Sequence, residues 1–230
     1  MKKLFVIIAA LGLAAASASA QTLRAPEFEL SSSDKVDSDL RIAFPMYFGF
    51  SAPMDSPSPF PNTKYTQNFY YALEVASIKF HSDTSPFSFS IGLKCTFMDF
   101  SFEDTSITYR KVGPALMPYP IIAENLKYDG KKSKVHASYV GAPIRFAFKA
   151  GRAKLFIGGG ADYMFHGYTK YRSPKYREDL NALFNPFHAY AEAGVTYSMI
   201  GLFANYSITP IFADGVSDTR TLTIGFTFGL

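Results

Sequence analysis

The chain has 230 residues, of which 48% are hydrophobic and only 18% are charged, a low charged fraction for a soluble surface. Aromatic residues make up 17%, all of them Phe or Tyr, which favour strands and membrane interfaces. The net charge of +4 comes from scattered Lys and Arg residues, so we expect no nucleic-acid partner. The single cysteine, Cys95, excludes an internal disulfide.

The N-terminus has the three parts of a secretory signal peptide. Lys2 and Lys3 precede a short apolar run, and small residues then form an A-x-A-type cleavage site before Gln21. The run is shorter than the roughly 20 residues that a spanning helix needs, and no later apolar run reaches that length. We therefore expect export through a cleaved signal peptide over 1–20. Residues 21–39 are polar and predict a flexible lead-in, and 40–230 fits one all-β domain.

Alternation of apolar with small or polar residues predicts the strands. It is strictest at the end of the chain, where Leu222, Ile224, Phe226, Phe228 and Leu230 are separated by Thr or Gly. Such a strand has two unlike faces, and a closed sheet is the β-structure that leaves no unpaired backbone in lipid. The predicted strands, with a bulge suspected near Ser77, are 40–50, 68–80, 86–102, 135–149, 154–168, 187–198, 201–212 and 219–230.

The connections between these strands alternate between long and short. A transmembrane barrel has long loops on its outer side and short turns on its periplasmic side. The pattern therefore predicts an all-β fold, an antiparallel up-and-down transmembrane β-barrel of about eight strands. We expect this barrel to occupy residues 40–230 in the cell outer membrane, with the lead-in over 21–39 on the periplasmic side. A soluble lipocalin-like barrel is the structural alternative, and it predicts an apolar interior and a polar exterior. The long connections are 51–67, 103–134 and 169–186, and the short ones are 81–85, 150–153 and 198–201.

The face opposite the apolar stripes carries charges of both signs. About eight strands leave room only for side chains, so opposite charges are expected to pair and fill the interior. We predict a closed polar lumen, with a narrow small-solute channel as the alternative. The predicted lumenal charges are Arg41, Glu74, Lys94, Arg145, Asp162 and Glu192.

The second half of the chain resembles a known family. Residues 138–165 read as a strand with a central proline, a tight turn and a Gly-rich strand, and 187–212 and the last strand follow. This pattern is similar to the outer-membrane β-barrel domain family common in Bacteroidetes, whose relatives include PorT-like proteins and small barrels of the OmpA and OmpX kind. The resemblance implies insertion by the barrel-assembly machinery and contact with outer-membrane lipid and lipopolysaccharide. Such barrels often end on an aromatic residue, whereas this chain ends on Leu230.

Catalytic and metal-binding residues are sparse. The four histidines have no metal-ligand spacing, so we expect no metal and no cofactor. His136 and Ser138 share a strand face, with His166 on the next strand, and a base beside a hydroxyl is the minimum for nucleophilic catalysis in a lipid-modifying barrel. No third orienting group and no strained elbow motif are recognisable, so we expect no enzyme. A lipid-modifying enzyme is retained as the third alternative.

Two long loops carry candidate contact residues. One is more apolar than a solvated loop needs, and the other is basic, which suits lipopolysaccharide phosphates or an anionic partner. An ordinary membrane rim explains the tyrosines and basic residues of the second loop equally well. The expected function is an envelope scaffold or a surface-loop interaction protein with an extracellular or periplasmic protein partner. The candidate contact residues are Tyr109, Met117, Tyr119, Ile121, Arg172, Lys175 and Arg177.

Overall fold

A computed structural model describes residues 23–24, 37–41, 44–54, 62–82, 85–112, 115–121, 132–172 and 176–230. The expected signal peptide, most of the expected lead-in and Lys175 lie outside these residues. In the described part of the chain, no helix is long and apolar enough to cross a bilayer.

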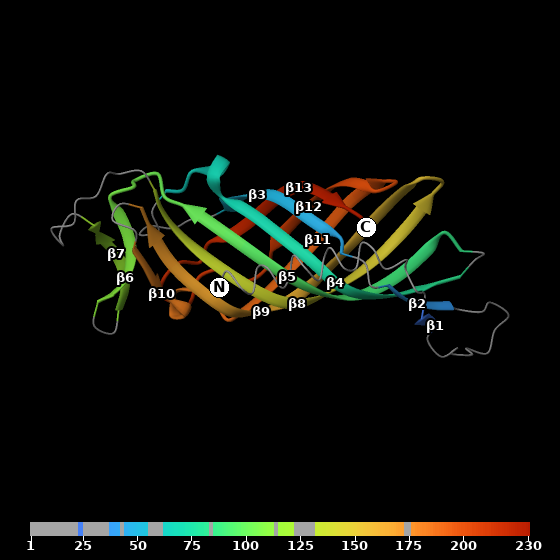
Figure 1. Ribbon diagram of the computed structural model, residues 1–230, viewed down its shortest axis with the longest axis horizontal. Coiled ribbons are helices and arrows are strands. Elements are labelled where there is room, and N and C mark those ends of the chain that lie inside the picture. Colours follow the sequence, from blue (N-terminus) through green and yellow to red (C-terminus); the bar gives the residue numbers. More distant parts are fainter. Residues whose placement is uncertain are drawn as a thin grey trace.

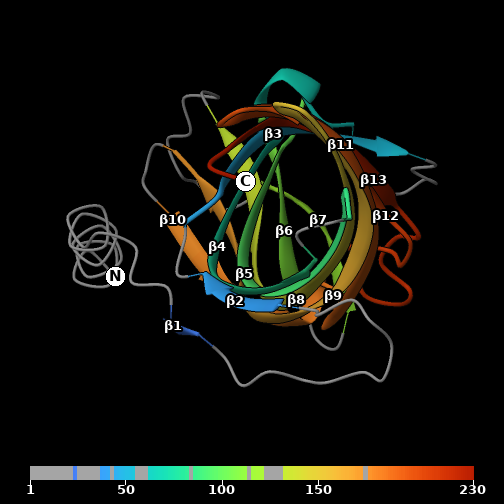
Figure 2. The same ribbon diagram turned by 90° about the vertical axis from the view of Figure 1, so that its right-hand side faces the viewer.

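Eight antiparallel strands close into a barrel, which confirms the fold that the alternation predicts (Figures 1 and 2). Each barrel strand pairs with the next barrel strand along the chain, and the ring closes where the last, β13, pairs with the first, β3. The barrel strands are β3 (Met46–Met54), β4 (Phe69–His81), β5 (Phe87–Ser101), β8 (Ser133–Ala150), β9 (Ala153–Tyr171), β11 (Phe187–Tyr197), β12 (Ile200–Ser207) and β13 (Arg220–Phe228).

The two ends of the barrel differ. The turn end holds the short β4–β5, β8–β9 and β11–β12 connections, and the loop end holds the long ones (Figure 1). At the turn end β2 (Asp37–Arg41) pairs with β4, and β1 (Leu23–Arg24) pairs with β2. The loop end holds β6 (Ile107–Val112) paired with β7 (Ala115–Pro120), β10 (Tyr176–Asp179) paired with β9, and the short 3-10 helices η1 (Tyr65–Gln67) and η3 (Asn181–Leu183).

Several strand boundaries differ from the prediction. The first barrel strand begins at Met46 rather than residue 40, and it continues through Pro53, which was expected in a loop. Pro53 is tolerated because the pairing of β3 with β4 ends at Phe50, so this edge of the strand needs no further ladder donor. The strand expected over 201–212 ends at Ser207, and Phe212 instead bridges to Phe184 at the loop end.

Two register irregularities interrupt the ladder. The one in β4 lies between Glu74 and Ala76, close to the expected position near Ser77. The other was not predicted, and it lies where Ser138 pairs with His166 but the next residue of β8 pairs with Met164. An extra residue in one strand re-aims side chains locally, and such bulges occur often beside functional sites.

The outward face of the barrel is apolar. Large apolar side chains alternate outward along every barrel strand, and many keep half or more of their surface exposed. The lipocalin-like alternative requires the opposite arrangement, so the outward face contradicts it. Examples from five strands are Phe146, Leu155, Ile157, Phe187, Leu202, Ile224 and Phe226.

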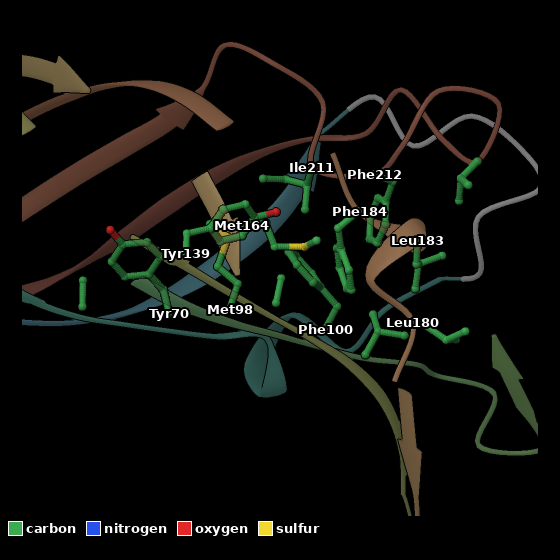
Figure 3. Close-up of a cluster of buried hydrophobic side chains, with 14 of the residues drawn as sticks. Tyr70, Met98, Phe100, Tyr139, Met164, Leu180, Leu183, Phe184, Ile211 and Phe212 are labelled. Atoms are coloured by element: carbon green, nitrogen blue, oxygen red, sulfur yellow. The ribbon is translucent and has the colours of Figure 1, made fainter. Parts of the chain in front are cut away.

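The lumen is filled along its length, but its two halves have different chemistry. The turn-end half holds the charged residues, as predicted, whereas the loop-end half is packed with apolar side chains (Figure 3). The expectation of a wholly polar lumen is therefore wrong for this half. The inward faces of β5 and β9 themselves become apolar there, at Met98, Phe100 and Met164, and the loops that follow β10 and β12 fold into the mouth of the barrel against them. The apolar plug comprises Met98, Phe100, Met164, Leu180, Leu183, Phe184, Ile211 and Phe212.

Candidate functional site

An ion network centred on Arg145 crosses the turn-end half of the lumen. Its Nη1 donates to Glu74 Oε2 at 2.5 Å, and its Nε donates to Glu192 Oε1. Lys94 Nζ lies 4.0 Å from Glu192 Oε2 and 3.8 Å from the centroid of the Tyr190 ring. The structure therefore brings together four of the six predicted lumenal charges, each no more than 5% exposed.

The other two predicted charges stand apart from this network. Arg41 lies in β2, and its side chain is outside the described part of the structure. Asp162 is buried, and its Oδ2 lies 3.6 Å from His188 Nδ1. His188 Nε2 is in turn 2.9 Å from Ser207 Oγ, and all three residues are enclosed in the lumen.

Little space remains inside the barrel. A cavity of about 50 Å³ opens at the turn end and reaches Glu74 and Arg145, which is room for water but not for a solute path. Beyond it the lumen is occupied by aromatic side chains and then by the apolar plug. Glycines accommodate these rings, since a Cβ at Gly160 would meet the Tyr190 hydroxyl at 2.5 Å. The charges therefore act as packed ion pairs in a filled interior.

The predicted loop contacts divide into buried and exposed residues. Tyr109 and Ile121 are 1% and 2% exposed, which differs from the expectation that they face a partner. Met117 is 41% exposed, and Tyr119 lies 5.6 Å below the Arg110 guanidinium. The two described basic residues differ from each other. Arg172 is exposed at the loop end, whereas Arg177 packs on the Tyr168 ring at the barrel wall.

A second polar group lies on the outside of the barrel, near the loop end. We call it the outer-wall cluster, and it comes from alternate residues of three neighbouring strands. Asp99 of β5 pairs directly with His136 of β8, and His136 pairs with Tyr168 of β9. Ser138 lies two residues along β8, opposite His166. Because alternate residues share a face, these side chains converge on the outer wall.

Hydrogen bonds connect three members of this cluster in series. Asp99 Oδ1 lies 2.7 Å from His136 Nδ1, and His136 Nε2 lies 2.9 Å from Ser138 Oγ. Lys134 Nζ binds the other carboxylate oxygen, Asp99 Oδ2, at 2.5 Å. The carboxylate accepts from Nδ1–H, so Nε2 presents its lone pair to the serine hydroxyl. In this arrangement the imidazole can take the serine proton.

Aromatic and basic neighbours hold the cluster in place. The ring of Tyr168 stacks on His136 at a centroid distance of 4.6 Å, and the Arg177 guanidinium lies 3.8 Å from the Tyr168 ring centroid. Arg177 Nη2 also donates to His166 Nε2 at 2.5 Å. Arg177 belongs to β10, which pairs with β9 beyond the stretch that pairs with β11. The long connection between β9 and β11, which contains β10, therefore completes the cluster.

Asp99 is the residue that sequence reasoning missed. The apolar stripe of β5 runs through Phe87, Ile91 and Phe97, and Asp99 is in phase with it. An acidic residue at the end of an apolar outward stripe is the sequence feature that could have identified Asp99 as a candidate site residue. In the same way, His136 and Ser138 are in phase with the outward stripe of β8. Within the described ranges, no group of three or more His, Cys, Asp or Glu side chains could hold a metal ion.

Comparison with solved structures finds a likeness in fold. No family model matches the chain, and no curated protein matches it. A crystal structure of Neisserial surface protein A (NspA) is similar, with 12% sequence identity and a TM-score of 0.41. The match covers 83% of this chain and 99% of that one.

Proposed function

We propose that this chain is an integral outer-membrane β-barrel, closed to solutes, that works through its outer wall and loops as an envelope scaffold or surface-interaction protein. The observation that carries the proposal is the apolar outward face of a closed sheet. Only a closed barrel satisfies all backbone groups of a sheet inside a bilayer, and only a bilayer gives such a face an apolar surrounding.

The filled lumen favours a closed barrel over the narrow channel. A solute would have to displace Arg145 from its two carboxylate partners and then pass the apolar plug. Separating a buried ion pair leaves uncompensated charge in a medium that solvates it poorly. Both barriers stand in series, so the interior is suited to support the wall rather than to conduct.

Basic residues at the loop end support contact with anionic lipid such as lipopolysaccharide. Lys132 and Arg172 are exposed there, close together, since the Arg172 N–H donates to the Lys132 carbonyl at 3.0 Å. Arginine and lysine bind phosphate groups, and interfacial tyrosines occupy the headgroup level. Insertion by the barrel-assembly machinery and a protein partner on the extracellular or periplasmic side complete the proposed role.

Two measurements on the same preparation test this proposal. Outer-membrane fractions are run on a gel with and without boiling, and the purified barrel is then added to a planar lipid bilayer. We expect a band that shifts on heating and no sustained conductance steps. A soluble periplasmic protein without a heat shift would refute the membrane barrel, and sustained steps would refute the closed lumen alone.

A further inference from the structure

We propose that Asp99, His136 and Ser138 form a serine hydrolase site on the outer wall, which cleaves the carboxylic esters of long acyl chains in anionic membrane lipids. The proposal rests on the proposed membrane-spanning barrel, because the bilayer brings the substrate to the wall. It goes beyond a scaffold role, and it replaces the missing third group of the sequence-based hypothesis with Asp99.

The outer-wall cluster is unusual for its position. The same stripes carry Phe97 on β5 and Val140 on β8, which adjoin the cluster on the turn-end side. Toward the loop end these stripes change from apolar side chains to carboxylate, imidazole and hydroxyl groups. Here three such groups are bonded to one another in the order carboxylate, imidazole, hydroxyl, at 2.7 and 2.9 Å. That order is what activation of a serine nucleophile requires.

The depth of Ser138 matches the depth of a lipid ester. The outward stripe of β8 runs from Phe148 to Ser138, ten residues apart in the sequence. At about 3.4 Å per residue and a tilt of about 40°, this stretch covers roughly 26 Å, close to the height of the apolar band of a membrane barrel. Ser138 therefore lies at the edge of the band, where acyl chains meet their headgroups.

Positive charge lies on the headgroup side of this serine. Lys134 is one position further out on the same stripe as His136, and Arg177 flanks His166. Lys132 and Arg172 are exposed beyond them. Phosphate groups bind such a set of donors through charge-assisted hydrogen bonds. The substrate class is therefore an anionic lipid with ester-linked acyl chains, either a glycerophospholipid or an acylated phosphoglycolipid.

The reaction balances with water as the co-reactant. Ser138 Oγ attacks the ester carbonyl carbon while its proton passes to His136 Nε2. The bond from the carbonyl carbon to the alcohol oxygen then breaks, and His136 returns the proton to the departing alcohol. Water attacks the acyl-serine, its proton passes to His136, and the acyl–Oγ bond breaks as Ser138 regains a proton and the fatty acid leaves. Asp99 acts through His136 and is a positioning residue.

The surroundings of the Ser138 hydroxyl affect both the entry of the ester and the stabilisation of the charge that forms on its carbonyl oxygen. Ser138 is 3% exposed, so an ester must displace neighbouring side chains of the outer wall as it enters. His166 lies opposite Ser138 because of the unpredicted bulge, and Arg177 is bonded to it. This pair supplies hydrogen-bond donors on the side of the serine away from Asp99, where the charge on the carbonyl oxygen develops.

The chain contains its own control. Asp162, His188 and Ser207 are the same residue types in the same order, but they are enclosed in the lumen. A lipid on the outer wall cannot reach Ser207. The variant Ser207→Ala therefore removes a serine beside a histidine without touching the outer-wall cluster.

The test uses the full-length barrel in detergent micelles, with a fluorophosphonate probe for reactive serines. Fatty acid release is then measured from phosphatidylglycerol vesicles and, separately, from lipopolysaccharide. We expect labelling and release in the unmodified protein and in Ser207→Ala. In Ser138→Ala the label is lost, and in His136→Gln release falls by about 10²- to 10⁴-fold. Release from one lipid but not the other identifies the substrate.

The heat shift on a gel separates the two proposals. A barrel that keeps its heat shift but shows neither labelling nor release overturns the hydrolase site alone, and so does labelling that persists in Ser138→Ala. Loss of the heat shift in the unmodified protein overturns the membrane barrel on which the inference rests. Variants are compared only where their heat shift matches that of the unmodified chain.

Discussion

Asp99 and His136 are direct partners across β5 and β8, and their side chains meet on the outer wall with Oδ1 and Nδ1 2.7 Å apart. They are 37 residues apart in the chain, with the β6–β7 hairpin between them. The register of the β5–β8 ladder therefore determines the cluster. A shift of one residue would move one side chain into the lumen and separate the pair.

Replacement of this carboxylate tests how it orients the imidazole. In Asp99→Asn the amide NH₂ can donate to Nδ1, which leaves the proton on Nε2 and removes the acceptor for the serine proton. We expect kcat for ester hydrolysis to fall by about 10²- to 10⁴-fold with little change in KM. Asp104→Asn is the matched control, because Asp104 is an exposed acid bonded to Ser106 outside the cluster. A rise in KM as large as the fall in kcat would indicate a structural role for Asp99 instead.

The lumenal ion network predicts a large stability effect at Arg145. In Arg145→Met the carboxylates of Glu74 and Glu192 remain buried without their partner, and breaking such a pair costs about 3–5 kcal/mol. The midpoint of the heat shift on a gel should fall accordingly. Arg152→Ala, in the exposed β8–β9 turn, should leave the midpoint unchanged. An unchanged midpoint in Arg145→Met would mean that the network adds nothing to stability.

The strand pattern could be predicted because its cause is local. Outward apolar residues alternate with inward ones along each barrel strand, and the phase of that alternation alone puts Glu74, Lys94, Arg145 and Glu192 inside. The predicted strand ends were wrong where pairing with a neighbouring strand decides how far a strand extends, as at Pro53. Phase also gave His136 and Ser138 a common face, but the partnership with Asp99 depends on which strands are neighbours and in what register.

The contents of the long loops could not be predicted for the same reason. Tyr109 and Ile121 look like exposed contact residues in a proline-containing loop, yet they are buried by contacts at the loop end. Leu183 and Phe184 enter the lumen because Phe100 and Phe212 provide an apolar surface there. These contacts join residues from distant parts of the chain. No short-range periodicity carries that information.

The apolar plug is the second barrier in the lumen, and its removal alone should not open the barrel. Phe184 is 1% exposed and packs on Phe212 at a centroid distance of 5.4 Å. Phe184→Ala should lower the free energy of unfolding by about 3–5 kcal/mol, because it leaves a cavity in the plug. Conductance should stay at background, because the Arg145 network still closes the turn-end half. Sustained steps in Phe184→Ala would place the barrier in the plug alone.

The outward face provides the most direct test of the membrane setting. Ile144 is 41% exposed on β8, near the middle of the stripe that runs from Phe148 to Ser138. A lysine there would place a charge among lipid chains, which costs about 2–4 kcal/mol near the midplane. We therefore expect Ile144→Lys to lower the free energy of unfolding in lipid vesicles by about that amount, as measured by urea titration. Ala150→Lys, next to the turn, is the control and should change little, because the charge there reaches water. Equal effects at both positions would mean that the stripe does not face lipid, and the outer-wall cluster would then lose its route to a membrane substrate.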